Sequence, residues 1–288
     1  MIFCLTEVAQ KIYICWYRMP TNIKDIGVRS LSGLGYVGIL LGAIYTGEGV
    51  FVGVISIFSA LALWEFLRLC KTSPWIPLIL LIASFTLGYL RLMPDFIRVL
   101  FLGLSLITNL FLTYVLFSQK RLDISPQKGF YFSIAYVLSS SYFIPEIGRT
   151  QAENSTALLV LFYLATWANN SFAYLVGSAI GKNKLLPKIS PKKSWEGFLG
   201  GTVATIFLAF TYSQYTNIES SLAILLGLSI PVLATVGDLI QSYFKRKANV
   251  KDSGSLLPGH GGFYDRMDSV IFSAPFYYII LIISNYVS

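Results

Sequence analysis

Residues 221–268 read SLAILLGLSIPVLATVGDLIQSYFKRKANVKDSGSLLPGHGGFYDRMD, an apolar run long enough to cross a bilayer that ends in a dense cluster of charges. A second apolar run, residues 269–287, follows directly. Charge is unfavourable near hydrocarbon and is normally confined to a membrane surface or a polar cavity. The stretch therefore predicts a helical membrane protein with its chemistry at the mouth of the bundle, where a polyanionic or metal-bearing ligand would bind.

The composition of the whole chain agrees with this interpretation. Of its 288 residues 55% are hydrophobic and only 12% are charged, with a mean hydropathy of +0.65, which excludes an ordinary soluble domain. A helix needs about 20 apolar residues to cross the hydrocarbon core. We expect an all-α fold, a polytopic integral membrane bundle of about nine transmembrane helices. Their predicted ranges are 30–47, 49–67, 74–90, 99–118, 129–145, 155–180, 195–213, 221–243 and 269–287.

The positions of Lys and Arg predict the orientation of the bundle. With nine crossings, 19 of the 22 basic residues fall in the N-terminal tail and in the loops on its side of the membrane, and only Arg91, Arg98 and Arg149 fall on the other side. Because short cytoplasmic loops carry the excess of positive charge, we expect a cytoplasmic N-terminus. Loops beside anionic lipid also account for the net charge of +8, so we expect no nucleic-acid partner.

The chain divides into three expected parts. Residues 1–29 form a cytoplasmic segment with an interfacial helix, since residues 1–20 mix apolar and charged positions and lack a signal-peptide pattern. Residues 30–150 form a transmembrane scaffold with few polar groups, Glu65 among them. Residues 151–288 form the transmembrane catalytic region, with cytoplasmic loops at 181–194 and 244–268.

The three cysteines, Cys4, Cys15 and Cys70, have no CxxC or metal-ligand spacing. All three fall on the expected cytoplasmic side, where disulfides are rare. Neither a disulfide framework nor a zinc site is therefore expected.

Three carboxylates stand out near the charged cluster. Asp238 lies inside an apolar run, where it needs a partner, either a cation such as Lys245 or a bound divalent metal. Asp265 and Asp268 are three residues apart and would share one face at the start of a helix. Together the three could supply the hard oxygen ligands that Mg²⁺ takes while it bridges phosphates, although acidic residues at a helix start also serve as caps.

The turn at residues 258–262, PGHGG, contains the only histidine of the chain, His260. Glycines let a backbone approach a ligand closely and present N–H groups to phosphate oxygens. His260 could donate to a phosphate or act as an acid or base. The alternative is a plain interhelical loop.

A second basic loop, GKNKLLPKISPKKSWEG at residues 181–197, carries five lysines. Alone it is typical of a topology signal. Its serines could cap the helix that begins at Trp195, its amines suit phosphate at a helix N-terminus, and Trp195 suits an interfacial anchor. The candidate binding residues here are Ser190, Lys192, Lys193, Ser194 and Glu196.

Both segments resemble the phosphatidate cytidylyltransferase family, through SPKKSWEG at residues 190–197 and the pattern that runs from Ser242 to Asp268. The similarity covers roughly residues 160–270. It implies an enzyme that joins CTP and phosphatidic acid to give CDP-diacylglycerol and pyrophosphate. It also implies a homodimer. The compact chain without long soluble extensions suggests a multi-pass protein of the bacterial inner (plasma) membrane, and the predicted topology places the active site on the cytoplasmic face.

The resemblance also implies roles for individual residues. The metal, Mg²⁺ with an assisting monovalent cation, is assigned to Asp238 and Asp265. The implied catalytic residues are Asp238, Asp265, Lys251, His260 and Arg266. Further substrate-binding residues are Ser242, Lys245, Arg246, Asp252, Gly261, Gly262 and Asp268.

Two neighbouring positions depart from the family pattern. Where the family usually has an Asp followed two residues later by Gly, this chain has Asn170 and Phe172. If the Asp supplies charge to the site, Asn170 weakens binding; if it only supports by hydrogen bonding, Asn can replace it.

Two other functions fit parts of the pattern. A lipid kinase that spends CTP on a polyprenol-type alcohol would share the basic loops and metal ligands. A transporter would place Asp238 along an ion path. The absence of a visible inverted repeat and the gathering of charge at one face disfavour the transporter.

Overall fold

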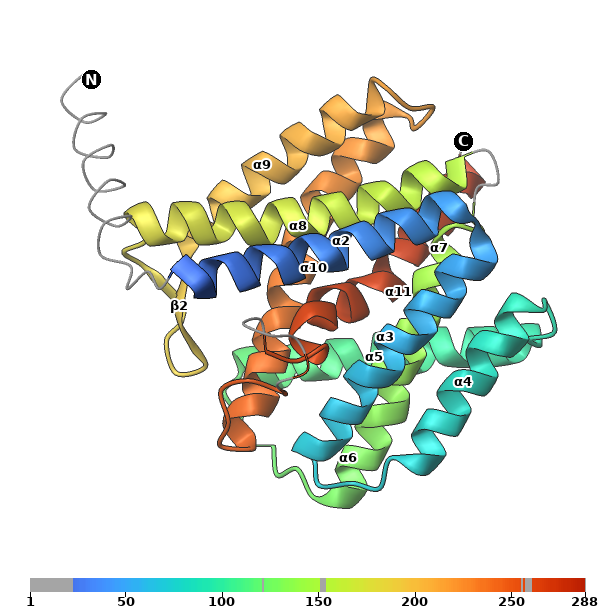
Figure 1. Ribbon diagram of the computed structural model, residues 1–288, viewed down its shortest axis with the longest axis horizontal. Coiled ribbons are helices and arrows are strands. Elements are labelled where there is room, and N and C mark those ends of the chain that lie inside the picture. The colour runs from blue at the N-terminus through green and yellow to red at the C-terminus, as the bar shows by residue number, and fades with distance from the viewer. Residues whose placement is uncertain (1–22, 121, 151–153, 255, 257–260, 288) are drawn as a thin grey trace.

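The structure is a computed structural model that describes residues 23–120, 122–150, 154–254, 256 and 261–287 (Figure 1). The N-terminal residues 1–22, with most of the expected interfacial segment, lie outside the described residues. His260 also lies outside them.

The first half of the chain is a series of helices joined by short turns. These are α2 (Ile23–Thr46), α3 (Glu48–Leu69), α4 (Trp75–Tyr89), α5 (Asp95–Phe117), α6 (Pro126–Phe132), the π-helix η1 (Ser133–Leu138) and α7 (Ser139–Ile147). Ser125 starts α6 as an N-cap, its hydroxyl accepting the Lys128 N–H, and Pro126 follows at the first helical position.

The second half adds four helices and a short hairpin. The elements are α8 (Ser155–Ile180), β1 (Lys184–Leu186), β2 (Ser190–Ser194), α9 (Trp195–Ser213), α10 (Ser220–Lys247) and α11 (Tyr264–Val287). The strands pair antiparallel, with Lys184 opposite Ser194 and Leu186 opposite Ser190. The all-α prediction is correct for the described residues apart from this hairpin, which occupies the basic loop of residues 181–194.

Five helices in the described part of the chain are long and apolar enough to cross a membrane: α3, α5, α8, α10 and α11. Helices also occupy the four other predicted ranges, where α6, η1 and α7 follow one another through residues 129–145. The count of nine crossings therefore stays a prediction.

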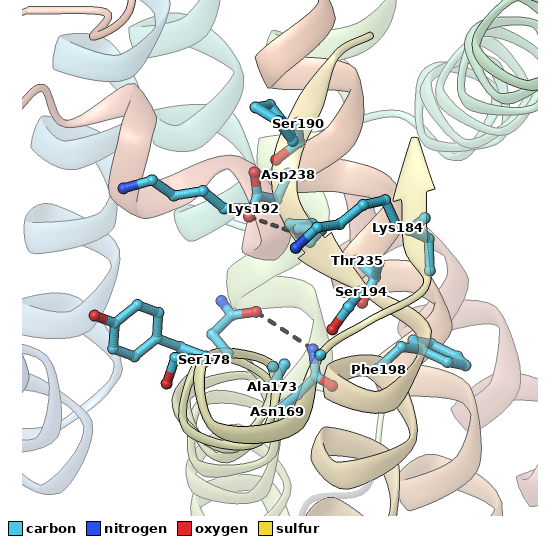
Figure 2. A pocket seen from close by; sticks show the side chains of 17 residues that line it. Asn169, Ala173, Ser178, Lys184, Ser190, Lys192, Ser194, Phe198, Thr235 and Asp238 are labelled. Carbon is cyan, nitrogen blue, oxygen red and sulfur yellow. Dashed lines mark hydrogen bonds and ion pairs between the residues drawn. The ribbon is translucent and has the colours of Figure 1, made fainter. Parts of the chain in front are cut away.

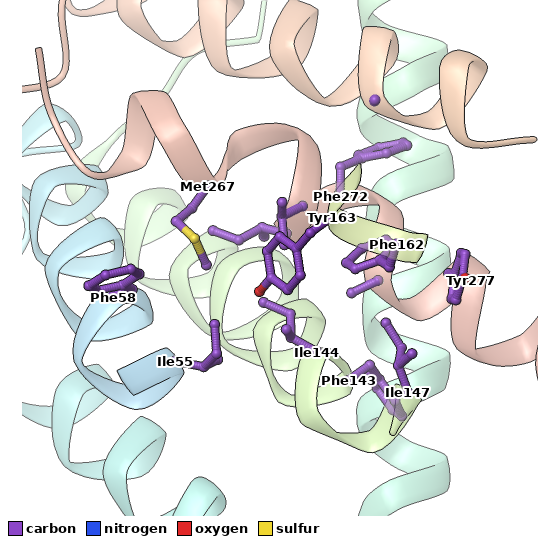
Figure 3. Close-up of a cluster of buried hydrophobic side chains, with 14 of the residues drawn as sticks. Ile55, Phe58, Phe143, Ile144, Ile147, Phe162, Tyr163, Met267, Phe272 and Tyr277 are labelled. Carbon is purple, nitrogen blue, oxygen red and sulfur yellow. The ribbon is translucent and has the colours of Figure 1, made fainter. Parts of the chain in front are cut away.

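The core lies between α3, α7, α8 and α11. Figure 3 shows Phe143 and Ile144 of α7, Phe162 of α8 and Phe272 of α11 gathered there, each almost fully buried. Large apolar side chains also lie on the outer surface, such as Val203 and Phe207 of α9 at 67% and 69% exposure. An apolar exterior around a packed interior is the arrangement expected of a bundle in lipid.

Small residues let α8 and α9 pack closely. A Cβ atom on Gly197 would lie 2.6 Å from the Ala173 carbonyl oxygen, and one on Gly201 would lie 2.8 Å from that of Asn169. Small residues at such contacts are typical of membrane helix pairs. This packing brings the end of α8, the hairpin and the start of α9 to the end of the molecule where α10 also finishes (Figure 1).

Cys70, directly after α3, is a buried free thiol. Burial raises the pKa of the Cys70 thiol to about 12, so it stays protonated at neutral pH. Within the described residues no three His, Cys, Asp or Glu side chains gather to hold a metal.

Candidate active site

A cavity of 560 Å³ lies between the C-terminal half of α8, the hairpin, the start of α9 and α10 (Figure 2). Five of the predicted site residues line it: Ser190, Lys192, Lys193, Ser194 and Asp238. The sequence interpretation gave no role in the site to four other polar side chains on its wall: Asn169, Lys184, Ser178 and Thr235. Thr235 stands one helical turn before Asp238, a spacing that could have identified it.

Asp238 is the acidic group of this cavity. Its Oδ2 lies 2.7 Å from the Lys193 ammonium, and its Oδ1 accepts a hydrogen bond of 3.3 Å from the Ser242 hydroxyl. The Asp238 side chain keeps 32% of its surface exposed. A cation partner was one of the two interpretations of Asp238, and the partner in this structure is Lys193 of the hairpin.

Ser194 and Glu196 support the hairpin from its base. The Ser194 hydroxyl accepts the Gly197 N–H at 3.2 Å, so Ser194 is the N-cap of α9, as expected. The Glu196 carboxylate accepts the backbone N–H of Lys182 and of Asn183, each at 3.1 Å. Glu196 does not line the cavity; it fixes the start of the loop that carries the lysines.

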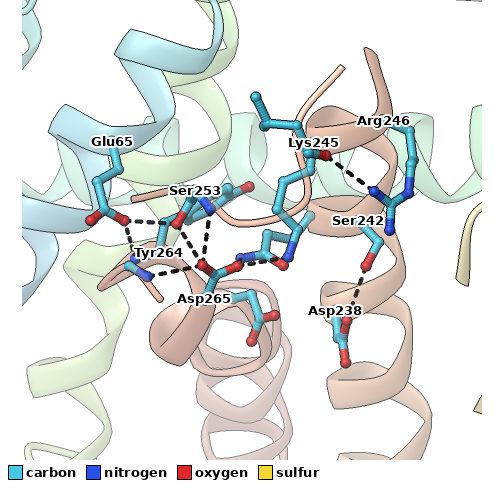
Figure 4. A network of polar contacts seen from close by, with 12 residues as sticks. Glu65, Asp238, Ser242, Lys245, Arg246, Ser253, Tyr264 and Asp265 are labelled. Atoms are coloured by element: carbon cyan, nitrogen blue, oxygen red, sulfur yellow. Dashed lines mark hydrogen bonds and ion pairs between the residues drawn. The ribbon is translucent and has the colours of Figure 1, made fainter. Parts of the chain in front are cut away.

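Asp265 is the centre of a second polar cluster (Figure 4). Its Oδ1 accepts from the Gln241 amide at 2.7 Å and from the Lys245 ammonium at 2.6 Å. Its Oδ2 accepts from the Ser253 N–H, the Ser253 hydroxyl and the Gly262 N–H, each at 3.0 Å. The carboxylate thus draws the loop after α10 onto the first turn of α11.

Glu65 of α3 reaches this second cluster from the scaffold half. Its Oε2 accepts from the Ser253 hydroxyl at 2.8 Å and from the Tyr264 N–H at 2.9 Å, and the residue is 1% exposed. The sequence interpretation placed Glu65 in the scaffold. The sequence did contain a signal for this contact: Glu65 is a carboxylate alone in an apolar helix, and such a group needs a partner.

The other predicted residues lie around these two clusters. Arg246 donates to the Ile189 carbonyl at 3.4 Å and the Val250 carbonyl at 3.1 Å, which ties the hairpin to the loop after α10. Asp268 is buried on α11, close enough to Asp238 for their charges to interact.

Three predicted residues on the loop and the first turn of α11 are exposed: Lys251, Asp252 and Arg266. Gly261 has a φ of +84°, a conformation that favours glycine.

The two carboxylates expected to hold Mg²⁺ differ in their freedom to do so. Asp238 faces the cavity, and each of its oxygens has a single donor, so it suits a hard cation with limited rearrangement. Asp265 is already surrounded by five donor contacts, and it would have to exchange Lys245 or another donor for a metal. Asp238 therefore suits Mg²⁺ with little rearrangement, whereas Asp265 would first have to release one of its donors.

The two residues that depart from the family pattern lie on different faces of α8. Asn170 lines the cavity, accepts from the Asn169 amide at 3.3 Å and donates to the Ser269 hydroxyl at 3.4 Å. Phe172 is 47% exposed and does not line the cavity. Only the Asn170 replacement therefore acts on the site.

Fold and site together define a helical membrane protein with a basic, carboxylate-containing cavity where helices end. The chain belongs to the Cytidylyltransferase family, whose model matches residues 27–284.

Several curated bacterial proteins named phosphatidate cytidylyltransferase are similar to it. The Bacillus subtilis protein is 32% identical over 267 residues, which cover 89% of this chain and 98% of that protein. The Staphylococcus epidermidis protein is 36% identical over 62% of this chain and 68% of its own length. The Haemophilus influenzae protein is 42% identical over a shorter match, 42% of this chain and 44% of its own length.

Proposed function

We propose that this protein is a CTP:phosphatidate cytidylyltransferase, which forms CDP-diacylglycerol and pyrophosphate. The family membership and the names of the similar proteins support this reaction. The structural observation that carries the proposal is the cavity in which hairpin lysines lie beside Asp238, because amines around a carboxylate suit a triphosphate.

In this reaction a phosphate oxygen of the lipid attacks the α-phosphorus of CTP. The new P–O bond forms while the bond between the α-phosphorus and the bridging oxygen breaks, and pyrophosphate leaves with the electron pair. The protein must align two anions and neutralise developing charge. Lys192 and Lys193 on the hairpin are placed to do this for the nucleotide. The lipid phosphate is itself the nucleophile, so no Ser or Cys nucleophile is required.

The resemblance assigns a Mg²⁺ ion, with an assisting monovalent cation, to Asp238 and Asp265, and we propose the same pair. When bound, Mg²⁺ would offset phosphate charge and polarise the reacting phosphorus. Lys193 would then turn from Asp238 toward the phosphates. Lys245 would leave Asp265 in the same way.

We further propose nine membrane crossings, a cytoplasmic N-terminus and a cytoplasmic active site in the inner membrane. The distribution of Lys and Arg and the helix positions support this topology. CTP would arrive from the cytosol while phosphatidate stays in the bilayer, and the site would lie where the two meet. A homodimer without nucleic acid is part of the same proposal and rests on the resemblance and the charge distribution.

The test uses purified protein in detergent micelles with CTP, phosphatidate and Mg²⁺. We expect CDP-diacylglycerol and pyrophosphate from the parent. Asp238→Asn should lower kcat/KM by about 100-fold or more, since a ligand for the reacting centre is lost. The matched control is Asp95→Asn, because Asp95 is 92% exposed at the start of α5 and should leave the rate unchanged. Equal rates for both variants would contradict the assigned site.

A further inference from the structure

A buried carboxylate from the first half of the chain holds the loop of the candidate active site. Glu65 lies near the end of α3, about 190 residues before the groups it contacts. We propose that Glu65 is a positioning residue, which fixes residues 251–254 and 261–262 of the loop after α10, together with the start of α11, so that Asp265 faces its partners. The proposal rests on the proposed function only where it concerns the rate.

Ser253 is shared by the two carboxylates. Its hydroxyl oxygen lies 2.8 Å from Glu65 Oε2 and 3.0 Å from Asp265 Oδ2, yet it has one proton to donate. Its backbone N–H points to Asp265 as well. The conformation of Ser253 therefore couples the two acids, and a shift of Glu65 would alter how Asp265 is held.

Two glycines of the described part of the loop lie close against the Glu65 carboxylate. A Cβ atom on Gly254 would lie 2.3 Å from Oε1, and one on Gly262 would lie 2.1 Å from Oε2. Such distances are far inside van der Waals contact, so a larger residue at either position would displace the Glu65 side chain or the backbone beside it. Gly262 also donates its N–H to Asp265, so a glycine that lies against Glu65 also holds a carboxylate of the candidate site.

Phe66, the residue next to Glu65, holds the side chain of Tyr264 at the start of α11. Phe66 is fully buried and packs edge-to-face on the Tyr264 ring, with centroids 5.6 Å apart. Glu65 accepts the Tyr264 backbone N–H, one of the helix-start donors that needs a partner outside its own helix. Consecutive residues of α3 thus hold both the backbone and the ring of Tyr264, directly before Asp265.

A purely structural anchor exists elsewhere on the same helix and offers a comparison. Glu48, at the start of α3, pairs with Arg91 at 3.2 Å and with Arg149 at 2.5 Å, away from both polar clusters. Its loss should affect helix packing and not the loop. Glu48→Gln is therefore the matched control for Glu65→Gln.

The experiment compares the full-length protein and its variants in micelles by kinetics and by hydrogen–deuterium exchange. Glu65→Leu removes the acceptor, and we expect kcat/KM to fall about 100-fold, as displaced catalytic groups commonly cause. Glu65→Gln can place its amide oxygen where Oε2 accepts from both Ser253 and Tyr264, so it should stay within about threefold of the parent. Exchange in peptides covering residues 251–264 should rise in Glu65→Leu but not in Glu65→Gln or Glu48→Gln, with α8 and α9 unchanged.

A second variant keeps the proposal testable if Glu65→Leu does not fold. Ser253→Ala removes the shared hydroxyl, and it should raise exchange in residues 251–264 and lower kcat/KM by about tenfold. Unchanged exchange in Glu65→Leu would overturn the positioning role. If the Glu65→Leu protein cannot be purified in folded form, unchanged exchange in Ser253→Ala would overturn it instead. Equal losses in Glu65→Gln and Glu65→Leu would also overturn it, because charge and not position would then matter. If the parent formed no product, the proposed reaction would fail, and exchange would still decide whether Glu65 holds the loop.

Discussion

The Lys193 ammonium lies 2.7 Å from Asp238 Oδ2, which joins the hairpin to α10 at the cavity. The contact brings together a basic loop and an acidic helix position 45 residues apart in the sequence. It leaves Lys193 close enough to act on any anion that enters. A lysine bound to a carboxylate can exchange it for a phosphate with little movement.

Lys193→Met should therefore weaken nucleotide binding. We expect KM for CTP to rise by about tenfold or more, the value of one charge-assisted hydrogen bond, with a smaller change in kcat. Steady-state kinetics with CTP as the varied substrate measure this.

Lys188→Met is the matched control for that variant. Lys188 is on the same hairpin but donates to the Gln119 side chain at 2.9 Å and does not line the cavity. Its KM should equal that of the parent. A rise of the same size in Lys188→Met would mean that general hairpin charge, and not the Asp238 contact, sets nucleotide affinity.

Glu196→Ala should loosen the hairpin without unfolding the bundle. The substitution removes the acceptor of the Lys182 and Asn183 N–H groups, so the lysines would sample more positions. We expect a several-fold rise in KM for CTP and little change in the thermal midpoint, measured by kinetics and by a melting curve. A large fall in melting temperature with normal kinetics would assign Glu196 to stability instead.

Gly262→Ala should impair activity, because its Cβ would lie 2.1 Å from Glu65 Oε2 and 2.3 Å from the Ser253 hydroxyl. Either the Glu65 and Ser253 side chains or the Gly262 backbone must shift, and each shift disturbs the contacts that hold Asp265. We expect a fall of about tenfold or more in kcat/KM. Gly103→Ala is the control, since a Cβ there meets nothing within 4 Å, and it should behave as the parent. Full activity in Gly262→Ala would show that the loop tolerates the shift.

Gly197→Ala should separate α8 and α9. Its Cβ would lie 2.6 Å from the Ala173 carbonyl oxygen, and backbone cannot yield as a flexible side chain can. Overpacking of this kind destabilises by about 1–3 kcal/mol, so the thermal midpoint should fall. Gly53→Ala, where a Cβ meets nothing within 4 Å, should melt with the parent. Coincident melting curves for all three proteins would contradict the packing described.

Much of the fold follows from the sequence because membrane helices depend on local composition. Apolar runs of sufficient length predicted helices at each expected range, and the serine before Trp195 predicted the N-cap that Ser194 forms. The hairpin of residues 184–194 was not predicted, because its strands are short and rich in lysine and proline. Its pairing depends on Glu196 and on the close approach of α8.

The candidate site was predicted in part. Residues that share a motif, such as Lys192, Lys193 and Ser194, do line one cavity with Asp238. The separation of Asp238 and Asp265 into two clusters depends on which lysine each one meets, a tertiary contact that spacing does not specify. Glu65 was missed for the same reason, since its partners Ser253 and Tyr264 lie 188 and 199 residues away in the sequence.

The most direct test of the account follows the label from CTP. Purified protein is incubated with phosphatidate and Mg²⁺, in parallel with CTP labelled at the α-phosphate and at the γ-phosphate. We expect α-label in the lipid product and γ-label only in pyrophosphate. Transfer of the γ-label to lipid, with release of CDP, would contradict it and would identify a kinase.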